Sequence, residues 1–335
     1  METLAAAAVE WLHLDASLTS HTIQSAIEKM VFVTLKRKGV VVGLSGGIDS
    51  SVVAALCVQA LGSDRVFGLF MPERECSGES YRLGKLLADA CGIATAIEDV
   101  TPILEGAGCY RRRDDAIRRL MPEYGENYRC KLVMADVASG ARYSFPSLVV
   151  QSPAGQTEKL HLDAQAYREL VAASNFKQRA RKMIEYYHAD RLQYAVAGTP
   201  NRLEFDQGFF VKNGDGAADL KPIAHLYKSQ VRQLAEYLGL PLEIRERPST
   251  TDTFPLAQSQ EEFYFQVSLR TFDLCLYGLN HGLHAHEVAH TTGLPVEQVE
   301  AVFQSIESKR AATRHLHQQP LLVEEVAEVH ALANS

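Results

Sequence analysis

The chain has 335 residues, of which 46% are hydrophobic and 22% charged, and its formal net charge is −7. This is ordinary globular composition, with enough apolar residues for one large domain or one domain with an appendage. Because the charge balance is acidic and no apolar run reaches the roughly 20 residues of a membrane-spanning helix, we expect neither nucleic acid nor membrane as a partner.

The cysteines and the first residues indicate the cytoplasm. The N-terminal alanine run is flanked by acidic residues and is not preceded by a basic segment, unlike a secretory signal peptide. No two of the six cysteines form a C-x-x-C pair, so reduced thiols are expected rather than a disulfide framework or a zinc site.

The first hundred residues alternate between predicted helices and short apolar strands. Apolar residues at helical spacing predict a helix over 21–38, before the β-branched strand 39–44. The pattern then repeats, with helices at 50–62 and 80–92 and strands at 65–71 and 93–100. Strands that alternate with helices predict an α/β fold with a doubly wound parallel sheet and flanking helices.

The segment 105–174 breaks this alternation, because turn residues are mixed there with short apolar pieces. We expect an insertion with some structure of its own, such as a lid or a substrate-facing segment. Within it, "RRRDDAIRR" at 111–119 is interpreted as a solvated helix face paired with its own aspartates.

Regular patterns return after the insertion. They predict a helix at 175–192, a strand at 193–198, a helix at 229–239 and a mainly helical region over 257–333. We therefore expect a domain over 1–255 that contains the insertion, and a helical C-terminal extension of the same domain over 256–335.

The turn "GLSGGIDS", residues 43–50, lies between the first predicted strand and a helix. A glycine-lined turn at a helix N-terminus offers backbone N–H groups and the positive end of the helix dipole, both suited to phosphate. A carboxylate there, Asp49, suits a divalent cation that bridges to the phosphates. The turn contains no lysine, so it is not a Walker A loop, and its glycine spacing is not that of a G-x-G-x-x-G motif.

Placed after a hydrophobic strand, S-G-G-x-D-S resembles the PP-loop of the ATP pyrophosphatase superfamily. Three further segments resemble the NAD+ synthetase family in its ammonia-using form: "NFKQRARKM", "GTPNRLEFDQGFFVKNGDGAADLKPIAHLYKSQVRQLAEYLGLP" and "RPSTTDTF". The resemblance covers roughly 22–104 and 175–315. It implies a fold like that of the adenine nucleotide alpha hydrolases.

The resemblance also implies roles for individual residues. Asp49 and Lys228 become catalytic residues, and Asp49 and Glu204 become ligands of Mg2+. Contacts to the acid substrate are implied for Arg179, Lys212 and Asp219. The implied ATP-binding residues are Gly43, Leu44, Ser45, Gly46, Gly47, Ile48, Asp49, Ser50, Thr199, Lys228 and Thr250.

The implied enzyme is a carbon–nitrogen ligase that forms AMP and pyrophosphate. The carboxylate of deamido-NAD+ attacks ATP to give an acyl-adenylate, and ammonia then displaces AMP to give NAD+. No nucleophilic residue is expected, because positioning and charge stabilisation carry such reactions.

Three departures from the family pattern fall on the acid-substrate side. "SKR" at 308–310 stands in place of H-K-R, "SQEEFYFQ" at 259–266 replaces an acidic stretch, and the 105–174 insertion is unusually long. These leave open the same chemistry on a different carboxylic acid, such as a sugar acid or a biosynthetic intermediate.

Two hypotheses from other functional classes have less support in the sequence. A tRNA-thiolating enzyme would need a cysteine pair near the nucleotide and a basic RNA face. Its best cysteine pair, Cys109 and Cys130, lies in the insertion. An inactive nucleotide-binding scaffold is disfavoured because Asp49, Glu204 and Lys228 are all present.

Nitrogen and subunit partners are expected from the resemblance. Only about 40 residues precede the turn, too few for a glutaminase domain, so nitrogen should come as free ammonia or from a separate glutaminase subunit. A homodimer is also implied.

His286 and His290 are one helical turn apart, a spacing that zinc can use. The pattern of segment 282–306 is explained more simply by two short helices joined by a Gly-Leu-Pro turn.

Overall fold

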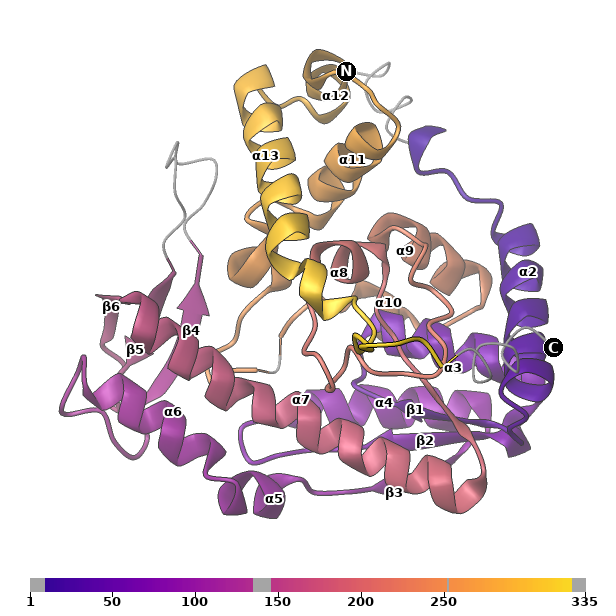
Figure 1. The fold of residues 1–335 in the computed structure, drawn as a ribbon, viewed down its shortest axis with the longest axis horizontal. Coiled ribbons are helices and arrows are strands. Elements are labelled where there is room, and N and C mark those ends of the chain that lie inside the picture. The colour runs from indigo at the N-terminus through magenta and orange to yellow at the C-terminus, as the bar shows by residue number, and fades with distance from the viewer. Residues whose placement is uncertain (1–9, 135–145, 252, 327–335) are drawn as a thin grey trace.

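The computed structural model describes residues 10–134, 146–251 and 253–326 (Figure 1). Its centre is a four-stranded parallel sheet with the strand order β3-β2-β1-β7. The strands are β1 (Val40–Gly43), β2 (Val66–Phe70), β3 (Ala94–Ile97) and β7 (Ala195–Ala197). All four strands lie within the segments that the sequence predicts.

Helices cover both faces of this sheet because successive β1 residues point to opposite sides. Val40 and Val42 pack in one buried cluster, whereas Val41 packs in another. The first cluster draws on α2 (Ala16–Glu28), α3 (Ile48–Leu61), α4 (Gly78–Cys91) and α9 (Lys228–Tyr237), and the second on α7 (Ala164–Leu192). The predicted doubly wound fold is confirmed.

Capping residues explain where several helices begin and end. Gly92, with φ of 64°, ends α4 in the left-handed conformation, as expected for a C-terminal glycine. At the other end, Asp15 accepts a hydrogen bond from the Leu18 N–H at 2.9 Å and so starts α2 at Ala16. The predicted start at residue 21 is therefore too late.

Two short elements complete this part of the chain. The helix α2 continues into the π-helix η1 (Lys29–Thr34), and a 3-10 turn, η2 (Ser63–Arg65), precedes β2.

The insertion carries its own small sheet. After α5 (Thr101–Gly106) and α6 (Cys109–Arg118), the strands β4 (Arg129–Val133), β5 (Ser147–Gln151) and β6 (Thr157–His161) pair antiparallel. Leu132, Leu148 and Val150 from this sheet share a buried cluster with Leu170 of α7. Residues 135–145 of the predicted insertion lie outside the described part of the chain.

Two expectations about this region are wrong. The helix predicted at 175–192 begins at Ala164, because Asp163 caps it by accepting from the N–H groups of Gln165 and Ala166. The 111–119 segment is not wholly a solvated face. Arg113 is buried and donates to Glu75 from another loop, so tertiary packing overrides the local charge pattern.

The C-terminal part is mainly helical, as predicted. Residues 257–326 form the π-helix η4 (Glu261–Phe265), α11 (Leu269–Asn280), α12 (Ala285–Thr292), α13 (Val296–Thr313) and η5 (Arg314–Leu316). The short helices α8 (Arg202–Gln207) and α10 (Leu242–Glu246) precede this region. The histidine-rich segment forms the two expected short helices, α12 and the start of α13, around residues 293–295.

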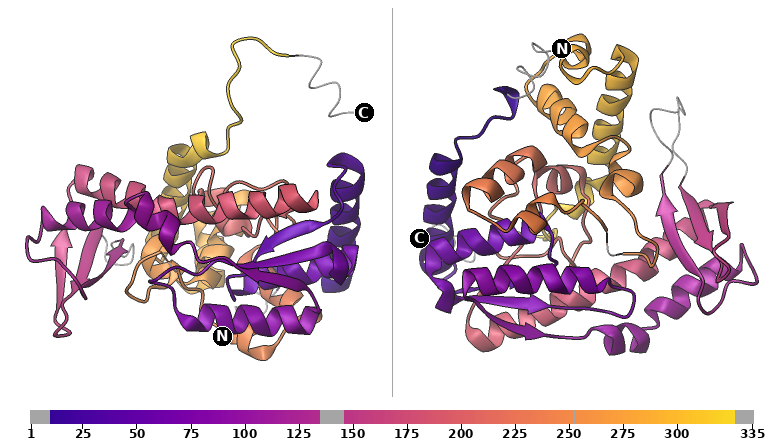
Figure 2. Two further views of the ribbon diagram at one scale, coloured as in Figure 1. Left: turned by 90° about the horizontal axis from the view of Figure 1, so that it is seen from below. Right: turned by 180° about the vertical axis from the view of Figure 1, so that it is seen from behind.

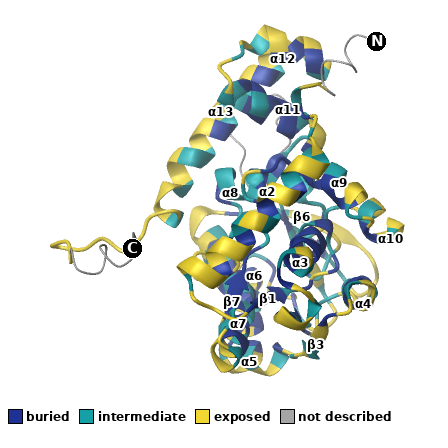
Figure 3. Cartoon of the chain, turned by 90° about the vertical axis from the view of Figure 1, so that its right-hand side faces the viewer, coloured by how far each residue is buried: buried dark blue, intermediate teal, exposed yellow. Residues whose placement is uncertain are grey.

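The C-terminal helices pack on the body of the molecule through a shared core. Leu203 of α8 and Tyr227, next to α9, join Phe272, Val302 and Ile306 in one buried cluster. Figure 3 shows α11 largely buried, whereas buried, intermediate and exposed residues are interspersed along α13. The boundary at 255/256 stays a prediction. No helix in the described ranges combines the length and apolarity needed to cross a membrane.

Candidate functional site

The site lies where the loops after β1 and β7 diverge. β1 connects through α3 to β2 on one side, whereas β7 pairs on the other side of β1. Such a switch point leaves a crevice at the carboxyl ends of the strands, where ligands bind in this type of fold. A cavity of about 1220 Å³ occupies this edge.

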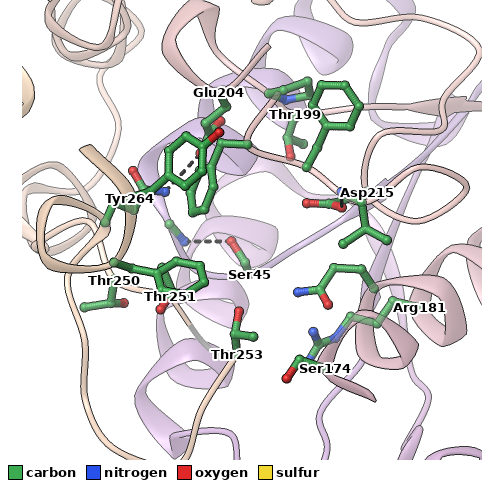
Figure 4. A pocket seen from close by; sticks show the side chains of 18 of the residues that line it. Ser45, Ser174, Arg181, Thr199, Glu204, Asp215, Thr250, Thr251, Thr253 and Tyr264 are labelled. Carbon is green, nitrogen blue, oxygen red and sulfur yellow. Dashed lines mark hydrogen bonds between the residues drawn. The ribbon is translucent and has the colours of Figure 1, made fainter. Parts of the chain in front are cut away.

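Most of the residues singled out in the sequence line this one cavity. They are Gly43, Leu44, Ser45, Gly47, Ile48, Asp49, Ser50, Arg179, Thr199, Glu204, Lys212, Lys228 and Thr250. Gly46 and Asp219 are not among its lining residues. In Figure 4, Ser45 lies between Thr250, Thr251 and Thr253 on one side and Asp215 and Arg181 on the other.

Short internal hydrogen bonds hold the 43–50 turn. Ser45 Oγ accepts from the Gly47 N–H at 3.2 Å, and the hydroxyls of Ser50 and Ser51 donate to the Gly47 carbonyl at 3.1 and 2.8 Å. Gly46 has φ of 70°, and a Cβ there would meet the Ser80 carbonyl at 2.4 Å. Glycine is thus required at this position for both conformation and space.

Asp49 lies between a cation and an amide. The Lys228 ammonium, on a side chain that is almost fully buried, forms an ion pair with Asp49 Oδ2. Asn201 donates from Nδ2 to Asp49 Oδ1 at 3.0 Å. The carboxylate of the turn is therefore held by residues that follow β7 and begin α9.

Glu204 reaches the same centre through Asn201. The Asn201 N–H donates to Glu204 Oε2 at 3.0 Å, which completes the capping box of α8, and Gln260 donates to Glu204 Oε1 at 2.9 Å. Partial burial and the negative charge of Asp49 raise the pKa of Glu204 to about 7. Asn201 thus links the two carboxylates that were predicted to share a metal.

Asp273, a fully buried carboxylate on α11, is a site residue that the sequence did not predict. It accepts hydrogen bonds from the backbone N–H groups of Lys228 and Ser229, at 3.1 and 2.7 Å, and so anchors the first turn of α9. Burial raises the pKa of Asp273 to about 6. No local signal marks it, because its partners lie on another helix.

Several cations line the cavity without a carboxylate within 4.0 Å in the described ranges: Arg168, Arg179, Arg181, Lys212 and Arg247. Arg179 and Lys212 lie on neighbouring segments, since Arg179 Nε donates to the Lys212 carbonyl at 3.3 Å. The Lys212 ammonium in turn donates to the carbonyls of His315 and Gln318, at 3.0 and 3.4 Å. The cavity is thus rich in positive charge that is suited to anionic ligands.

Asp219 lies beside β7 and outside the cavity lining. Its Oδ2 accepts from the Val196 N–H at 2.7 Å, and its Oδ1 accepts from the Tyr186 hydroxyl at 3.4 Å. Asp215, from the same "NGDGAADL" segment, lines the cavity instead. A sequence with two aspartates so close together does not indicate which one faces the ligand.

Part of the cavity lining is apolar and aromatic. Phe209 stacks on Tyr264 with ring centroids 4.6 Å apart, and Phe263 lies 5.7 Å from Phe209. Leu132 and Tyr167, from the insertion and the N-terminal part of α7, line the same cavity. The unusual 259–266 stretch and the insertion therefore both border the site.

Comparison with known proteins decides the family. The family model for NAD synthase matches residues 19–123 and 148–320. The chain belongs to the NAD synthase family. An NH(3)-dependent NAD(+) synthetase from Mesorhizobium japonicum is 56% identical over 95% of this chain and 99% of its own length. Another from Rhizobium meliloti is 57% identical over 88% of this chain and 89% of its own length.

A solved structure shares the fold. NMN synthetase from Francisella tularensis superposes with a TM-score of 0.64 at 21% identity, over 93% of this chain and 100% of that chain. At this identity the likeness concerns the fold. It places this NAD synthase-family chain among parallel-sheet proteins with helices on both faces, as predicted.

Proposed function

We propose that this chain is an ammonia-dependent carbon–nitrogen ligase that converts deamido-NAD+ to NAD+ with ATP. Its family membership and its high identity to named NAD+ synthetases support this function. The single structural observation that carries it is the meeting of the 43–50 turn, Lys228 and Glu204 at one cavity. These elements provide a phosphate-binding turn, a cation and a second carboxylate.

The turn residues and their neighbours would bind ATP. Backbone N–H groups at the start of α3, the hydroxyls of Ser45 and Ser50, and Lys228 offer donors and positive charge to the phosphates. We assign further contacts with ATP to Thr199 and Thr250, which line the same cavity.

Asp49 and Glu204 fit a magnesium ion. Mg2+ takes oxygen ligands and usually keeps only one or two protein carboxylates, with phosphate and water completing its shell. Asn201 bonds to both side chains and so holds their oxygens near one another. When bound, the ion would neutralise charge on the phosphates.

The reaction needs two displacements, and the chain supplies charge and position for both. In the first, a carboxylate oxygen of the acid attacks the α-phosphorus, and the bond to pyrophosphate breaks. In the second, ammonia attacks the acyl carbon, AMP leaves and a proton is released. Lys228, held by Asp49 and by Asp273 through the backbone, is placed to offset charge that develops on the phosphates.

The acid substrate would lie toward Arg179 and Lys212, two cations without an ion pair among the described residues, which suit a dinucleotide diphosphate. We retain Asp219 as a proposed substrate residue, although it lies beside β7 in this structure. The alternative, the same chemistry on another carboxylic acid, is favoured by one observation: Phe263 and Tyr264, from a stretch that departs from the family pattern, line the cavity.

An assay with deamido-NAD+, ATP and ammonia tests the proposal. We expect NAD+, AMP and pyrophosphate in equal amounts, measured by mass spectrometry. No turnover of deamido-NAD+ by protein that still binds ATP would favour another acid, which a screen of carboxylic acids would then identify.

Replacing Asp49 with Asn tests the metal assignment. The substitution removes a metal-binding charge, so we expect pyrophosphate release to fall by about 100-fold or more. Asp64→Asn, at an exposed aspartate near β2, serves as the control and should keep full activity. Unchanged pyrophosphate release by Asp49→Asn, with an unaltered circular dichroism spectrum, would remove the magnesium assignment.

Nitrogen source, assembly and location complete the proposal. We propose free ammonia as the nitrogen donor, with a separate glutaminase subunit as the alternative, and a homodimer with twice the 37.0 kDa chain mass. Light scattering measures the mass directly. None of the six cysteines, all of which lie in the described ranges, forms a disulfide, consistent with the reducing cytoplasm. Cys109 and Cys130 are buried away from the cavity lining, which gives no support to a thiolation reaction.

A further inference from the structure

Arg247 contacts the 43–50 turn at Ser45, near the start of the turn, whereas Lys228 contacts it at Asp49, near the end. Arg247 Nη1 donates to the Ser45 carbonyl at 3.2 Å, and Nη2 donates to Ser80 Oγ at 2.8 Å. Arg247 also lines the cavity. Lys228, in contrast, reaches the turn at Asp49. Within the described ranges, these are the cavity cations that bond to residues 43–50.

The charge of Arg247 is not used by an ion pair in the part of the chain that the structure describes. The neighbouring carboxylates are engaged elsewhere, since Arg82 pairs with both Glu79 and Glu243 at 2.7 Å. Lys228 is already neutralised by Asp49. The pKa of the exposed Glu79 carboxylate is lowered first by its hydrogen bond from Arg82 and also by the charge of Arg247, which interacts with it only beyond ion-pair distance, so the Arg247 guanidinium stays available to a ligand.

Its position also suits a polyphosphate. A Cβ on Gly46 would lie 3.0 Å from Arg247 Nη1, so the guanidinium lies directly against the glycine turn. A guanidinium has five N–H donors in a planar fork, and two of its nitrogens donate to residues in the described ranges. The remaining donors can take phosphate oxygens in the bidentate manner that arginine favours.

We propose that Arg247 is a second phosphate-binding cation of this site and holds the pyrophosphate portion of ATP. Lys228 and Arg247 would then flank the turn, one at its Asp49 end and one at its Ser45 end. The bond between the α-phosphorus and pyrophosphate breaks, and the electron pair stays on pyrophosphate, whose added charge Arg247 would offset. This inference rests on the proposed nucleotide site at residues 43–50.

Pyrophosphate binding tests the role directly. Isothermal titration of the full chain with magnesium pyrophosphate should give affinity that is roughly tenfold or more weaker in Arg247→Gln, because a hydrogen bond to a charged group is lost. Arg247→Lys keeps the charge without the fork and should fall between the two. Arg82→Gln, a nearby exposed arginine on α4, is the matched control and should bind as the unmodified chain does.

Kinetics separate this role from a structural one. Arg247→Gln should raise KM for ATP and weaken product inhibition by pyrophosphate, while KM for the acid stays unchanged. A lower melting temperature with unchanged pyrophosphate affinity would overturn the proposal, because Arg247 would then act only as a structural clamp between the turn and α4.

Lys228→Met distinguishes failure of this inference from failure of the proposed nucleotide site. Weaker pyrophosphate binding in Lys228→Met but affinity within twofold of the original in Arg247→Gln would refute only the role of Arg247. Unchanged binding in both variants, or no binding by the unmodified chain, would refute the nucleotide site together with this inference.

Discussion

Asp273 and Lys228 illustrate how a single buried residue can position another. The Asp273 carboxylate accepts three hydrogen bonds from the start of α9: two backbone N–H groups and the Ser229 hydroxyl, the last at 2.6 Å. A carboxylate at a helix N-terminus also interacts favourably with the helix dipole. The Lys228 side chain therefore starts from a fixed backbone before it reaches Asp49.

The titration of Asp273 predicts a pH dependence of stability. Its pKa is raised to about 6 by burial, above the ordinary value near 3.9 in the unfolded chain. The folded state then holds a proton that the unfolded state has lost, so this contribution is present at low pH and is lost as pH rises from about 4 through 6. The hydrogen bonds from Ser229 and Lys228, together with the charge of Lys228, favour the ionised form and limit the effect.

Urea unfolding of the unmodified chain and of Asp273→Asn, at pH 5 and pH 7, measures this pH dependence of stability. The free energy of unfolding of the unmodified chain, relative to the variant, should be lower at pH 7 than at pH 5 by about 1.3 kcal/mol, because about one pKa unit of the shift is expressed between these two pH values. Equal differences at the two pH values would contradict the assignment.

At the scale of elements, α8 is a short helix whose cap belongs to the site. Asn201 Oδ1 accepts from the N–H groups of Leu203 and Glu204, at 2.9 and 3.3 Å, while its amide holds Asp49. The same side chain thus starts a helix and orients a proposed metal ligand. Loss of the side chain should affect both stability and activity.

Two helix caps separate these effects. Asn201→Ala and Asp163→Ala should each lose about 1 kcal/mol of stability, because each removes an N-cap. Only Asn201→Ala should weaken Mg2+-dependent pyrophosphate release, since Asp163 caps α7 at its end in the insertion. Denaturant unfolding and a pyrophosphate-release assay measure the two quantities. Equal activity in both variants would show that Asn201 is a cap and nothing more.

At the scale of the whole molecule, α7 runs from the insertion to the parallel sheet and connects the two (Figure 1). A buried charge network joins it to the loop after β2. The Lys177 ammonium pairs with Glu73 at 2.9 Å and Glu75 at 2.7 Å, while Tyr110 and Arg113 of α6 bond to the same two carboxylates. Residues that border the cavity are thereby fastened to the insertion.

Removing one partner of this network should be costly. Lys177→Met leaves the buried Glu73 carboxylate without its cation, and such changes typically cost about 3–5 kcal/mol. The exposed pair of Lys85 and Asp89 is the comparison, and Lys85→Met should cost less than about 1 kcal/mol. Guanidinium unfolding of both variants measures the difference. A loss in Lys177→Met as small as in Lys85→Met would contradict the network's structural role.

The C-terminal segment reaches back to the site at Lys212, which donates to carbonyls of residues 315 and 318. Beyond residue 318, the chain as far as residue 326 extends away from the body (Figure 2), and Leu321 and Val323 are exposed. The segment 314–318 therefore contacts the proposed acid side of the cavity, whereas the following residues do not.

Two shortened chains test this contact. A chain that ends at residue 313 frees the Lys212 side chain to adopt many rotamers, so KM for the acid should rise by up to about tenfold. A chain that ends at residue 318 keeps both carbonyls and should retain the original KM. Steady-state kinetics with the acid and ATP varied separately measures the effect, and equal KM values for the two shortened chains would exclude it.

Most helices and strands of the parallel-sheet part could be predicted from the sequence, because their patterns are local. The alternation of apolar residues predicted the order of strands and helices, and the glycines and serines of 43–50 predicted a phosphate-binding turn. Polar strands such as β6 and buried charges such as Arg113 lacked a local signal. Their environment comes from partners that are distant in the chain.

Which loops meet at the site depends on how distant parts of the chain pack together. Asn201 and Lys228 reach Asp49 across 152 and 179 residues of sequence, and Arg247 reaches Ser45 across 202. Side-chain periodicity acts over a few residues, so it carries no information on such distances. The strand order determines which loops come together. Because β7 lies beside β1, the loops after these two strands meet at the same edge of the sheet, around one cavity.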